Sequence, residues 1–138
     1  SETILALARA LRKHQNLKKI NLSGNRINES AGFLLMGLKK TKVLEEIALA
    51  RCRLGNIVAD LTEVLGKLQS LRRIDLSENG ICDSTVESMA KNLKTLTNVE
   101  EINLTGNSFG MRGAIILAES LQWHMLEKLN LNGVKIMP

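Results

Sequence analysis

Apolar and polar residues follow one another along this chain in a motif that returns at a fixed interval. The motif reads L-x-x-L-x-L-x-x-N-x-L, where L stands for an apolar residue and x for a variable one. Four copies are clear, and a fifth carries Val134 in place of the asparagine. The copies begin at Leu17, Leu44, Leu71, Val99 and Leu126, which are 27 or 28 residues apart. Such a period indicates stacked repeats rather than one core of unlike elements.

Each copy of the motif predicts a short strand followed by a turn. Ile20 and Leu22 show the period of two that places alternate side chains of a strand in the core. The asparagine position ends the strand, and its side chain can bond to backbone groups of neighbouring repeats. This structural ladder comprises Asn25, Cys52, Asn79 and Asn107. We interpret Cys52 as a buried member of the ladder rather than as a reactive thiol.

About 16 residues after each strand have the spacing of an amphipathic helix, for example Val58, Leu61 and Leu65. Ser84 followed by Glu87 has the pattern of a capping box at a helix start. Alternation of strands and helices indicates a parallel sheet. The sequence therefore predicts an α/β solenoid, with a parallel β-sheet on its concave face and α-helices on its convex face.

The segments LSENGI (76–81) and LTGNSF (104–109) resemble the ribonuclease-inhibitor-like subfamily of leucine-rich repeats. The resemblance covers essentially the whole chain. It implies one domain over residues 1–138, with about five repeats in a horseshoe arc. The subfamily includes ribonuclease inhibitor, the sensor domains of NACHT-type (NLR) innate immune receptors, Ran GTPase-activating proteins and tropomodulin-type actin cappers. The two segments are most similar to the receptor and activator branches.

The repeat at each end of the chain is incomplete. The helical spacing at Ile4, Leu7, Ala8 and Leu11 has no strand of its own, and the last strand has no helix after it. Terminal repeats of a solenoid normally carry a polar cap, and neither end has this pattern. We therefore expect a fragment of a longer array, or ends that pair with neighbouring chains.

Strand side chains that do not enter the core are expected on the concave face. The two positions after the first motif residue read Lys-Lys, Glu-Glu, Arg-Arg, Glu-Glu and Glu-Lys in the five copies. Neighbouring strands lie roughly 4.8 Å apart, so these alternating charges favour cross-strand ion pairs over a row that reads a ligand. The candidate partner-binding residues on this face are Lys19, Asn21, Arg51, Arg72, Arg73, Asp75, Asn103 and Asn130.

Positive charge is concentrated in the first part of the chain. Residues 1–42 carry nine Lys or Arg and two Glu, a net charge of +7, whereas residues 43–138 carry ten basic and twelve acidic residues, a net charge of −2. A group that we call the basic edge consists of Arg12, Lys13, Lys39, Lys40 and Lys42. Cations at helix C-termini complement the helix dipole, so these residues are either solvated helix ends or a surface for an acidic partner.

The composition argues against several classes of function. His14 and His124 lie about four repeats apart, and no residue spacing suits a metal site, a catalytic triad or a phosphate-binding loop, so we expect no enzyme activity, metal or cofactor. Aromatic residues make up only 2% of the chain, which argues against nucleic-acid binding. No apolar stretch is long enough to span a membrane. Two cysteines are too few for a disulfide scaffold, and we expect a reducing, cytoplasmic location.

The resemblance and the absence of chemistry together predict a non-catalytic protein-interaction or ligand-sensing module. Its partners would be other proteins or other domains of its own parent chain, as in an NLR-type innate immune receptor. Two alternatives stay open, namely a GTPase activator similar to the Ran activators and an actin-binding domain similar to tropomodulin. No aromatic residue is expected on the strand face, so arginines are its candidate anchors.

Overall fold

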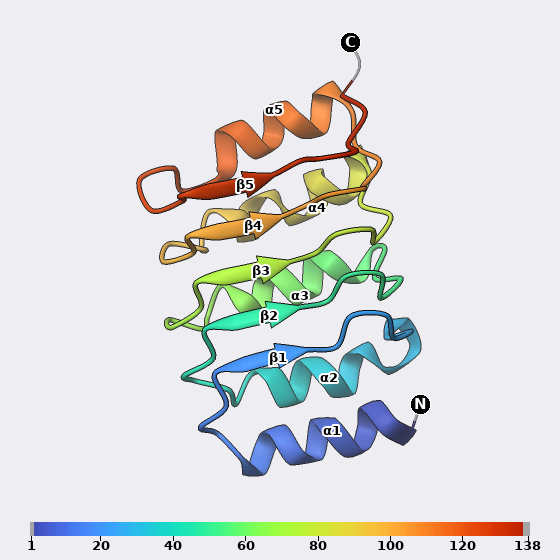
Figure 1. The fold of residues 1–138 in the computed structure, drawn as a ribbon, viewed down its shortest axis with the longest axis vertical. Helices are drawn as coiled ribbons and strands as arrows, with labels where there is room; N and C mark the ends of the chain where they lie inside the picture. The colour runs from blue at the N-terminus through green and yellow to red at the C-terminus, as the bar shows by residue number, and fades with distance from the viewer. Residues whose placement is uncertain (1, 137–138) are drawn as a thin grey trace.

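The structure is a computed structural model that describes residues 2–136, apart from the side chain at position 28. It is an elongated two-layer stack in which strands and helices alternate (Figure 1). The strands are β1 (Lys19–Asn21), β2 (Glu46–Ala48), β3 (Arg73–Asp75), β4 (Glu101–Asn103) and β5 (Lys128–Asn130). The helices are α1 (Glu2–Lys13), η1 (Asn28–Ser30, a 3₁₀ turn), α2 (Ala31–Leu38), α3 (Ile57–Leu65), α4 (Asp83–Leu93) and α5 (Met111–Ser120).

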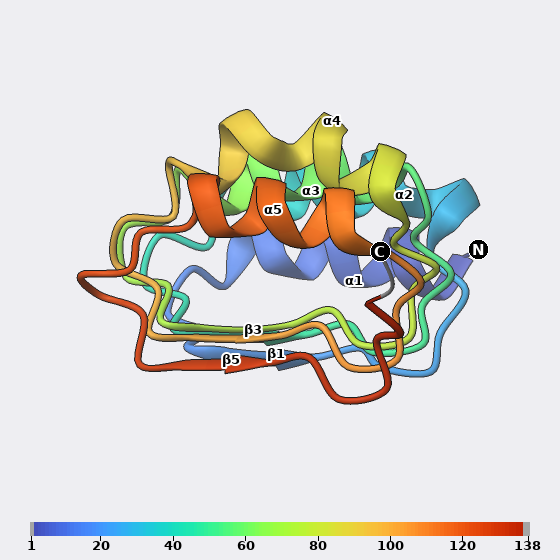
Figure 2. The ribbon, with the colours of Figure 1, turned by 90° about the horizontal axis from the view of Figure 1, so that it is seen from above.

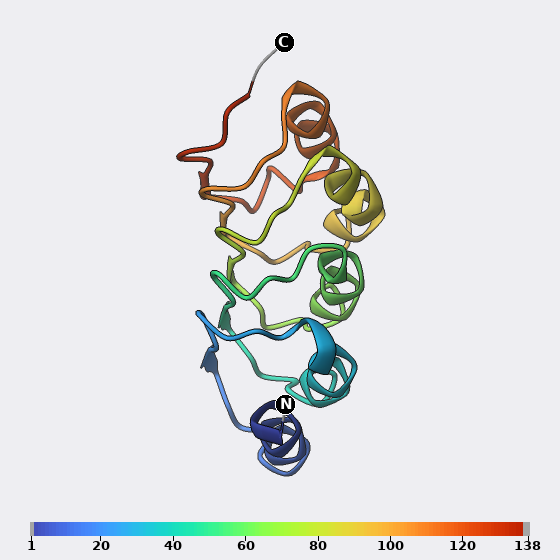
Figure 3. The same cartoon turned by 90° about the vertical axis from the view of Figure 1, so that its right-hand side faces the viewer.

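The five strands form one parallel sheet in the order β1-β2-β3-β4-β5. The sheet makes one layer and the helices make the other, as the views in Figures 2 and 3 show. The central residue of each strand points into the space between the layers, and these residues pair in register from Ile20 to Leu129. The predicted α/β leucine-rich-repeat solenoid is therefore confirmed.

The helices of the repeats are shorter than the 16 residues that the spacing predicts, because the chain needs turns to reach the next strand. Helix α2 has 8 residues and α4 has 11. Thr41 lies just beyond α2, where its Oγ1 donates a hydrogen bond of 2.6 Å to the Leu38 carbonyl. The backbone N–H of Thr41 donates to the same carbonyl at 3.0 Å. These bonds tighten the last turn and end the helix.

The capping-box prediction at Ser84 is wrong. Helix α4 begins one residue earlier, at Asp83, after Cys82 in an extended conformation, and the N-cap residue makes no side-chain capping bond. Asp83 instead bonds to the next repeat, where its Oδ1 accepts from the backbone N–H of Gly110 at 2.8 Å and of Gly113 at 2.9 Å. The carboxylate thus joins two repeats rather than capping its own helix.

The ladder position lies at the carboxyl end of the strands and is buried in the inner repeats. Asn79 Oδ1 accepts hydrogen bonds from the backbone N–H of Cys52 at 3.0 Å and of Leu54 at 3.3 Å. Asn107 bonds in the same way to the backbone of the Asn79 repeat, at 2.9 and 3.0 Å. Asn25, in the first repeat, is exposed, and within residues 2–136 its side chain bonds only to the Leu22 carbonyl of its own turn.

Helices α1 and α2 lie close together because α2 carries a glycine at their contact. A Cβ atom on Gly37 would lie 2.9 Å from the backbone oxygen of Ala8 and 3.3 Å from the Cβ of Leu11. The missing side chain lets the two backbones approach, so the C-terminal ends of α1 and α2 lie beside each other. Helix α3 packs less closely against α2 than the other helices pack against their neighbours.

Candidate protein-interaction surface

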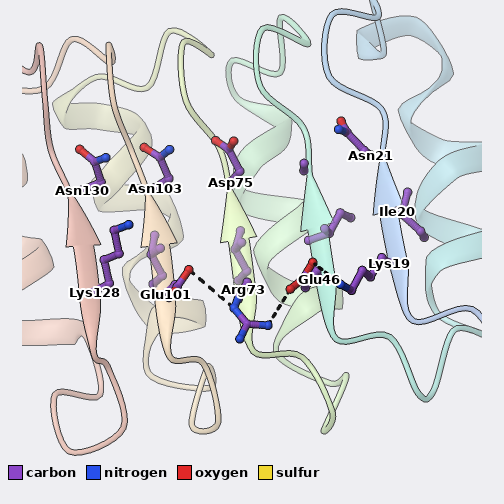
Figure 4. Close-up of a pocket in the computed structure, with 14 residues that line it drawn as sticks. Lys19, Ile20, Asn21, Glu46, Arg73, Asp75, Glu101, Asn103, Lys128 and Asn130 are labelled. Atoms are coloured by element: carbon purple, nitrogen blue, oxygen red, sulfur yellow. Dashed lines mark hydrogen bonds and ion pairs between the residues drawn. The ribbon is translucent and has the colours of Figure 1, made fainter.

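The concave face of the sheet contains a hollow of about 460 Å³ that crosses all five strands (Figure 4). Two rows of side chains border it, one from the first and one from the third residue of each strand. The charged row consists of Lys19, Glu46, Arg73, Glu101 and Lys128. The short row consists of Asn21, Ala48, Asp75, Asn103 and Asn130. Strand alternation gives both rows, because first and third residues point to the same side of a sheet.

The charged row alternates in sign across the five strands, and ion pairs link its first four members. Arg73 lies at its centre, with Nη1 2.6 Å from Glu46 Oε1 and Nε 3.7 Å from Glu101 Oε2. Lys19 Nζ lies 3.7 Å from Glu46 Oε2. These side chains are substantially exposed, so each pair contributes at most about 1 kcal/mol to stability. Their main effect is to cancel most of the charge of the row, which agrees with the cross-strand pairing expected from the sequence.

The short row also has a structural role at the ends of the strands. The Oδ1 atoms of Asn21, Asp75, Asn103 and Asn130 each accept the backbone N–H of the residue two positions later, at 2.9 to 3.0 Å. This is the Asx turn that Asn and Asp favour. Asp75 Oδ1 also accepts from the Ser77 hydroxyl at 2.6 Å. The amide nitrogens of the three asparagines make no hydrogen bond within residues 2–136 and can still donate to a partner.

The hollow gathers six of the eight sequence-selected residues of the concave face, and two lie outside it. Arg51 lies in the turn after β2 with a φ of 52°, and its Nη1 is 2.9 Å from Glu78 Oε2. Arg72 precedes β3 and folds onto its own loop, where Nη1 donates to the carbonyls of Gln69 at 3.1 Å and Leu71 at 3.3 Å.

Three charged lining residues were not among the selected candidates, namely Glu46, Glu101 and Lys128. Each occupies the same position of its repeat as Arg73, so the repeat frame itself was the information that could have identified them.

These repeats are similar in sequence to a known family and to known proteins. A family described as "Leucine Rich repeat" matches residues 13–35, a segment that contains β1 and the start of α2. A ribonuclease inhibitor of Sus scrofa is 30% identical over 147 residues, which cover 83% of this chain. The chain consists of leucine-rich repeats similar to those of ribonuclease inhibitor.

Two further relatives of this repeat chain carry the name Protein NLRC5. The protein of Homo sapiens is 37% identical over 118 residues, 85% of this chain, and that of Mus musculus is 33% identical over 121 residues, 87% of this chain. The repeat chain spans 32% of the length of ribonuclease inhibitor and 6% of that of either NLRC5 protein. These relationships support a protein-interaction module.

Within the described residues, no three His, Cys, Asp or Glu side chains lie close enough to hold a metal ion. No helix of residues 2–136 is both long enough and apolar enough to cross a membrane. His14 and His124 are both exposed, at opposite ends of the leucine-rich-repeat stack. The candidate functional features of residues 2–136 are therefore the contact surfaces described above.

The two cysteines of the repeats have different environments. Burial raises the pKa of the fully buried Cys52 thiol, which donates to the Leu22 carbonyl at 3.2 Å. Cys82 is partly exposed at the start of α4, and hydrogen bonds from the hydroxyls of Ser84 and Thr85 lower its pKa from 9.0 to about 7. Hydroxyl donors stabilise the thiolate, and thiolates are the reactive form of cysteine.

Cys82 is expected to react with iodoacetamide at neutral pH in the folded protein, while Cys52 stays unmodified. The rate should rise with a midpoint near pH 7, because the thiolate is the nucleophile. Ser84→Ala removes the largest stabilising hydrogen bond and should move this midpoint to higher pH. Ser88→Ala, one turn further along α4, is the control and should leave the midpoint in place. Rates measured by mass spectrometry from pH 5 to 10 test this, and equal midpoints for the two variants would contradict it.

Proposed function

We propose that this chain binds a protein partner in the hollow of its concave face, as part of a longer repeat array. In our proposal it is a ligand-sensing or autoinhibitory segment of a cytoplasmic NLR-type innate immune receptor, with no catalytic role. The partner is then another protein or another domain of the same parent chain. The observation that carries the proposal is the hollow itself, whose two rows of side chains run unbroken across all five strands.

The short row favours a partner segment that lies directly against the sheet. Its side chains are small, and four of the five are held by their own Asx turns, so they lose little conformational freedom when a partner covers them. Three residues of this row, Asn21, Asn103 and Asn130, have amide nitrogens that are free to donate hydrogen bonds to a partner. A helix or loop that crosses the strands and offers carbonyl or carboxylate oxygens fits these donors.

The charged row contributes more to the selectivity of binding than to its affinity. Arg73 is already held by two glutamates, so a partner gains little by replacing those ion pairs with its own. A partner with the opposite alternation of charge matches the row, whereas one of uniform negative charge meets Glu46, Asp75 and Glu101. Charge complementarity of this kind chooses between partners more than it adds affinity. It supports a protein ligand over a nucleic acid.

The proposal predicts that a photo-crosslinking amino acid at Asn103 forms a discrete crosslink, either to another protein or to another domain of the parent chain, when the parent chain is expressed in cells. The same amino acid at Lys91, an exposed residue of α4 in the helix layer, should form none. Ala48→Trp fills the hollow without removing a side-chain hydrogen bond and should reduce the Asn103 product by about tenfold, a loss of about 1.4 kcal/mol.

Ala6→Trp, at an exposed position of α1, is the matched control and should leave the Asn103 product unchanged. Equal capture from Asn103 and Lys91, or a product that survives Ala48→Trp at full yield, would contradict binding in the hollow. Circular dichroism of the two tryptophan variants checks that both are folded.

A further inference from the structure

The basic edge lies where the helices end and the chain turns toward the next strand. Arg12 and Lys13 are in the last turn of α1, Lys39 directly follows α2, and Lys40 and Lys42 lie in the turn after it. Because the helices are parallel, their C-terminal ends line up on one side of the stack, the left side in Figure 1. Tight packing of α1 on α2 at Gly37 brings the two basic groups together.

The charges of this edge are not cancelled as those of the concave face are. All five side chains are exposed, and none forms an ion pair with a residue in the described range 2–136. Glu45 is the nearest acidic residue in sequence, at the start of the next strand segment. Five of the nine basic residues in positions 1–42 therefore lie together on this edge of the folded chain.

Helix ends account for only part of this cluster. Arg12, Lys13 and Lys39 are at the last turns of α1 and α2, where a cation stabilises the helix by about 0.3–1 kcal/mol. Lys42 lies four residues beyond the end of α2 at Leu38, and the effect of the dipole fades within one turn. The dipole therefore does not explain the positive charge of Lys42 or its position beside that of α1.

A groove extends the basic edge from α2 to α3. It has a volume of about 240 Å³ between α2 and α3, the two helices that pack least closely. Lys39 and Lys67 line it from the C-terminal ends of the two helices, and Leu35 and Val64 supply apolar wall. Asp60 and Glu63 line the same groove further along α3 and form no ion pair within the described residues. The groove is thus basic at the end that meets the edge and acidic toward its interior.

We propose that the basic edge, extended by Lys67, docks an acidic segment of a protein partner. Helix axes are 8–10 Å apart in packed pairs, so the ends of α1, α2 and α3 span roughly 20 Å. An extended chain covers this distance with about six residues. One acidic side chain of the segment enters the mouth of the groove between Lys39 and Lys67, while Asp60 and Glu63 stop it from running further in.

The surroundings favour an acidic peptide over a nucleic acid. The loops that join the first three helices to their strands contain no aromatic residue on which a base could stack. The strands that begin at this edge carry Glu45 and Glu46, which repel a phosphate backbone that continues onto the concave face. A short acidic segment that ends at the edge avoids this repulsion.

The test measures the fluorescence polarisation of a labelled twelve-residue peptide of glutamate and glycine with the folded chain in 50 mM salt. Lys40→Glu with Lys42→Glu should weaken binding by about tenfold or more. Arg26→Glu with Arg53→Glu changes the net charge by the same amount on the opposite edge and should alter binding by less than about twofold. Both pairs of residues are exposed and none forms an ion pair in the described range, so both variants should fold.

Three results would overturn the proposal, namely no binding by the unsubstituted chain, equal weakening by both double variants, or displacement of the peptide by twelve-residue oligodeoxythymidine at equal concentration. Ala48→Trp should leave peptide binding unchanged, because the hollow lies on the concave face. The basic edge and the hollow can therefore fail or succeed independently.

Discussion

Replacing Asn79 with alanine is expected to lower the free energy of unfolding by about 3–5 kcal/mol. The Asn79 side chain accepts from the buried N–H groups of Cys52 and Leu54 and donates to the Leu49 carbonyl at 2.7 Å. Alanine leaves these groups without partners in a region that excludes water. Each unsatisfied buried donor costs about 1–3 kcal/mol, and here two backbone donors lose the same acceptor.

Asn25→Ala is the matched control, because Asn25 has the same place in the motif but is exposed. Its side chain donates a hydrogen bond of 2.9 Å to the Leu22 carbonyl, and water can replace this acceptor. We expect a loss below about 1 kcal/mol for this variant. Urea unfolding followed by circular dichroism at 222 nm measures both, and equal losses would show that the inner ladder bonds do not contribute as described.

Phe109→Ala should cost about 3–5 kcal/mol of stability, the usual range for a buried phenylalanine. Phe109 is 0% exposed and occupies the last motif position of the fourth repeat, where other inner repeats carry Leu54 or Ile81. A Cβ on Gly113, four residues later, would lie 2.8 Å from the Phe109 Cβ. The repeat thus accommodates the ring by omitting a side chain, and alanine at 109 leaves a cavity that the neighbours cannot fill.

Phe33→Ala is the control for the loss of the same side chain at the surface. Phe33 is 49% exposed on α2, so its removal should change the free energy of unfolding by about 0.5 kcal/mol or less. The same urea titration measures this pair. A cost for Phe33→Ala as large as that for Phe109→Ala would contradict the packing argument, as would a Phe109→Ala variant as stable as the parent chain.

The sequence gives the positions of the concave residues with good accuracy but not their individual contacts. Arg72 and Arg73 are identical neighbours in the motif, and both are sequence candidates for the partner surface. Strand β3 begins at Arg73, which faces the hollow between two glutamates, whereas Arg72 precedes the strand and bonds to its own loop. The difference depends on where the first ladder bond of the strand forms, and one residue reverses the direction of a side chain.

The start of helix α4 shows the same limit. Ser84 and Glu87 satisfy the local pattern of a capping box, yet the helix begins at Asp83, whose carboxylate bonds to Gly110 and Gly113 of the next repeat. Local pattern rules count the bonds within one helix end. They do not include bonds to another repeat, such as those that Asp83 accepts from residues 27 and 30 positions later in the chain.

The sequence by itself determined the repeat period, the parallel solenoid and the alternation of charge on the strand face. These features follow from a short motif because each repeat packs mainly on its two neighbours, so every copy has a similar environment. Only the tertiary structure decided which charges are cancelled in the hollow and which stay unpaired along the basic edge. That outcome depends on lateral distances and side-chain directions at the ends of strands and helices, where turns rather than periodicity set the geometry.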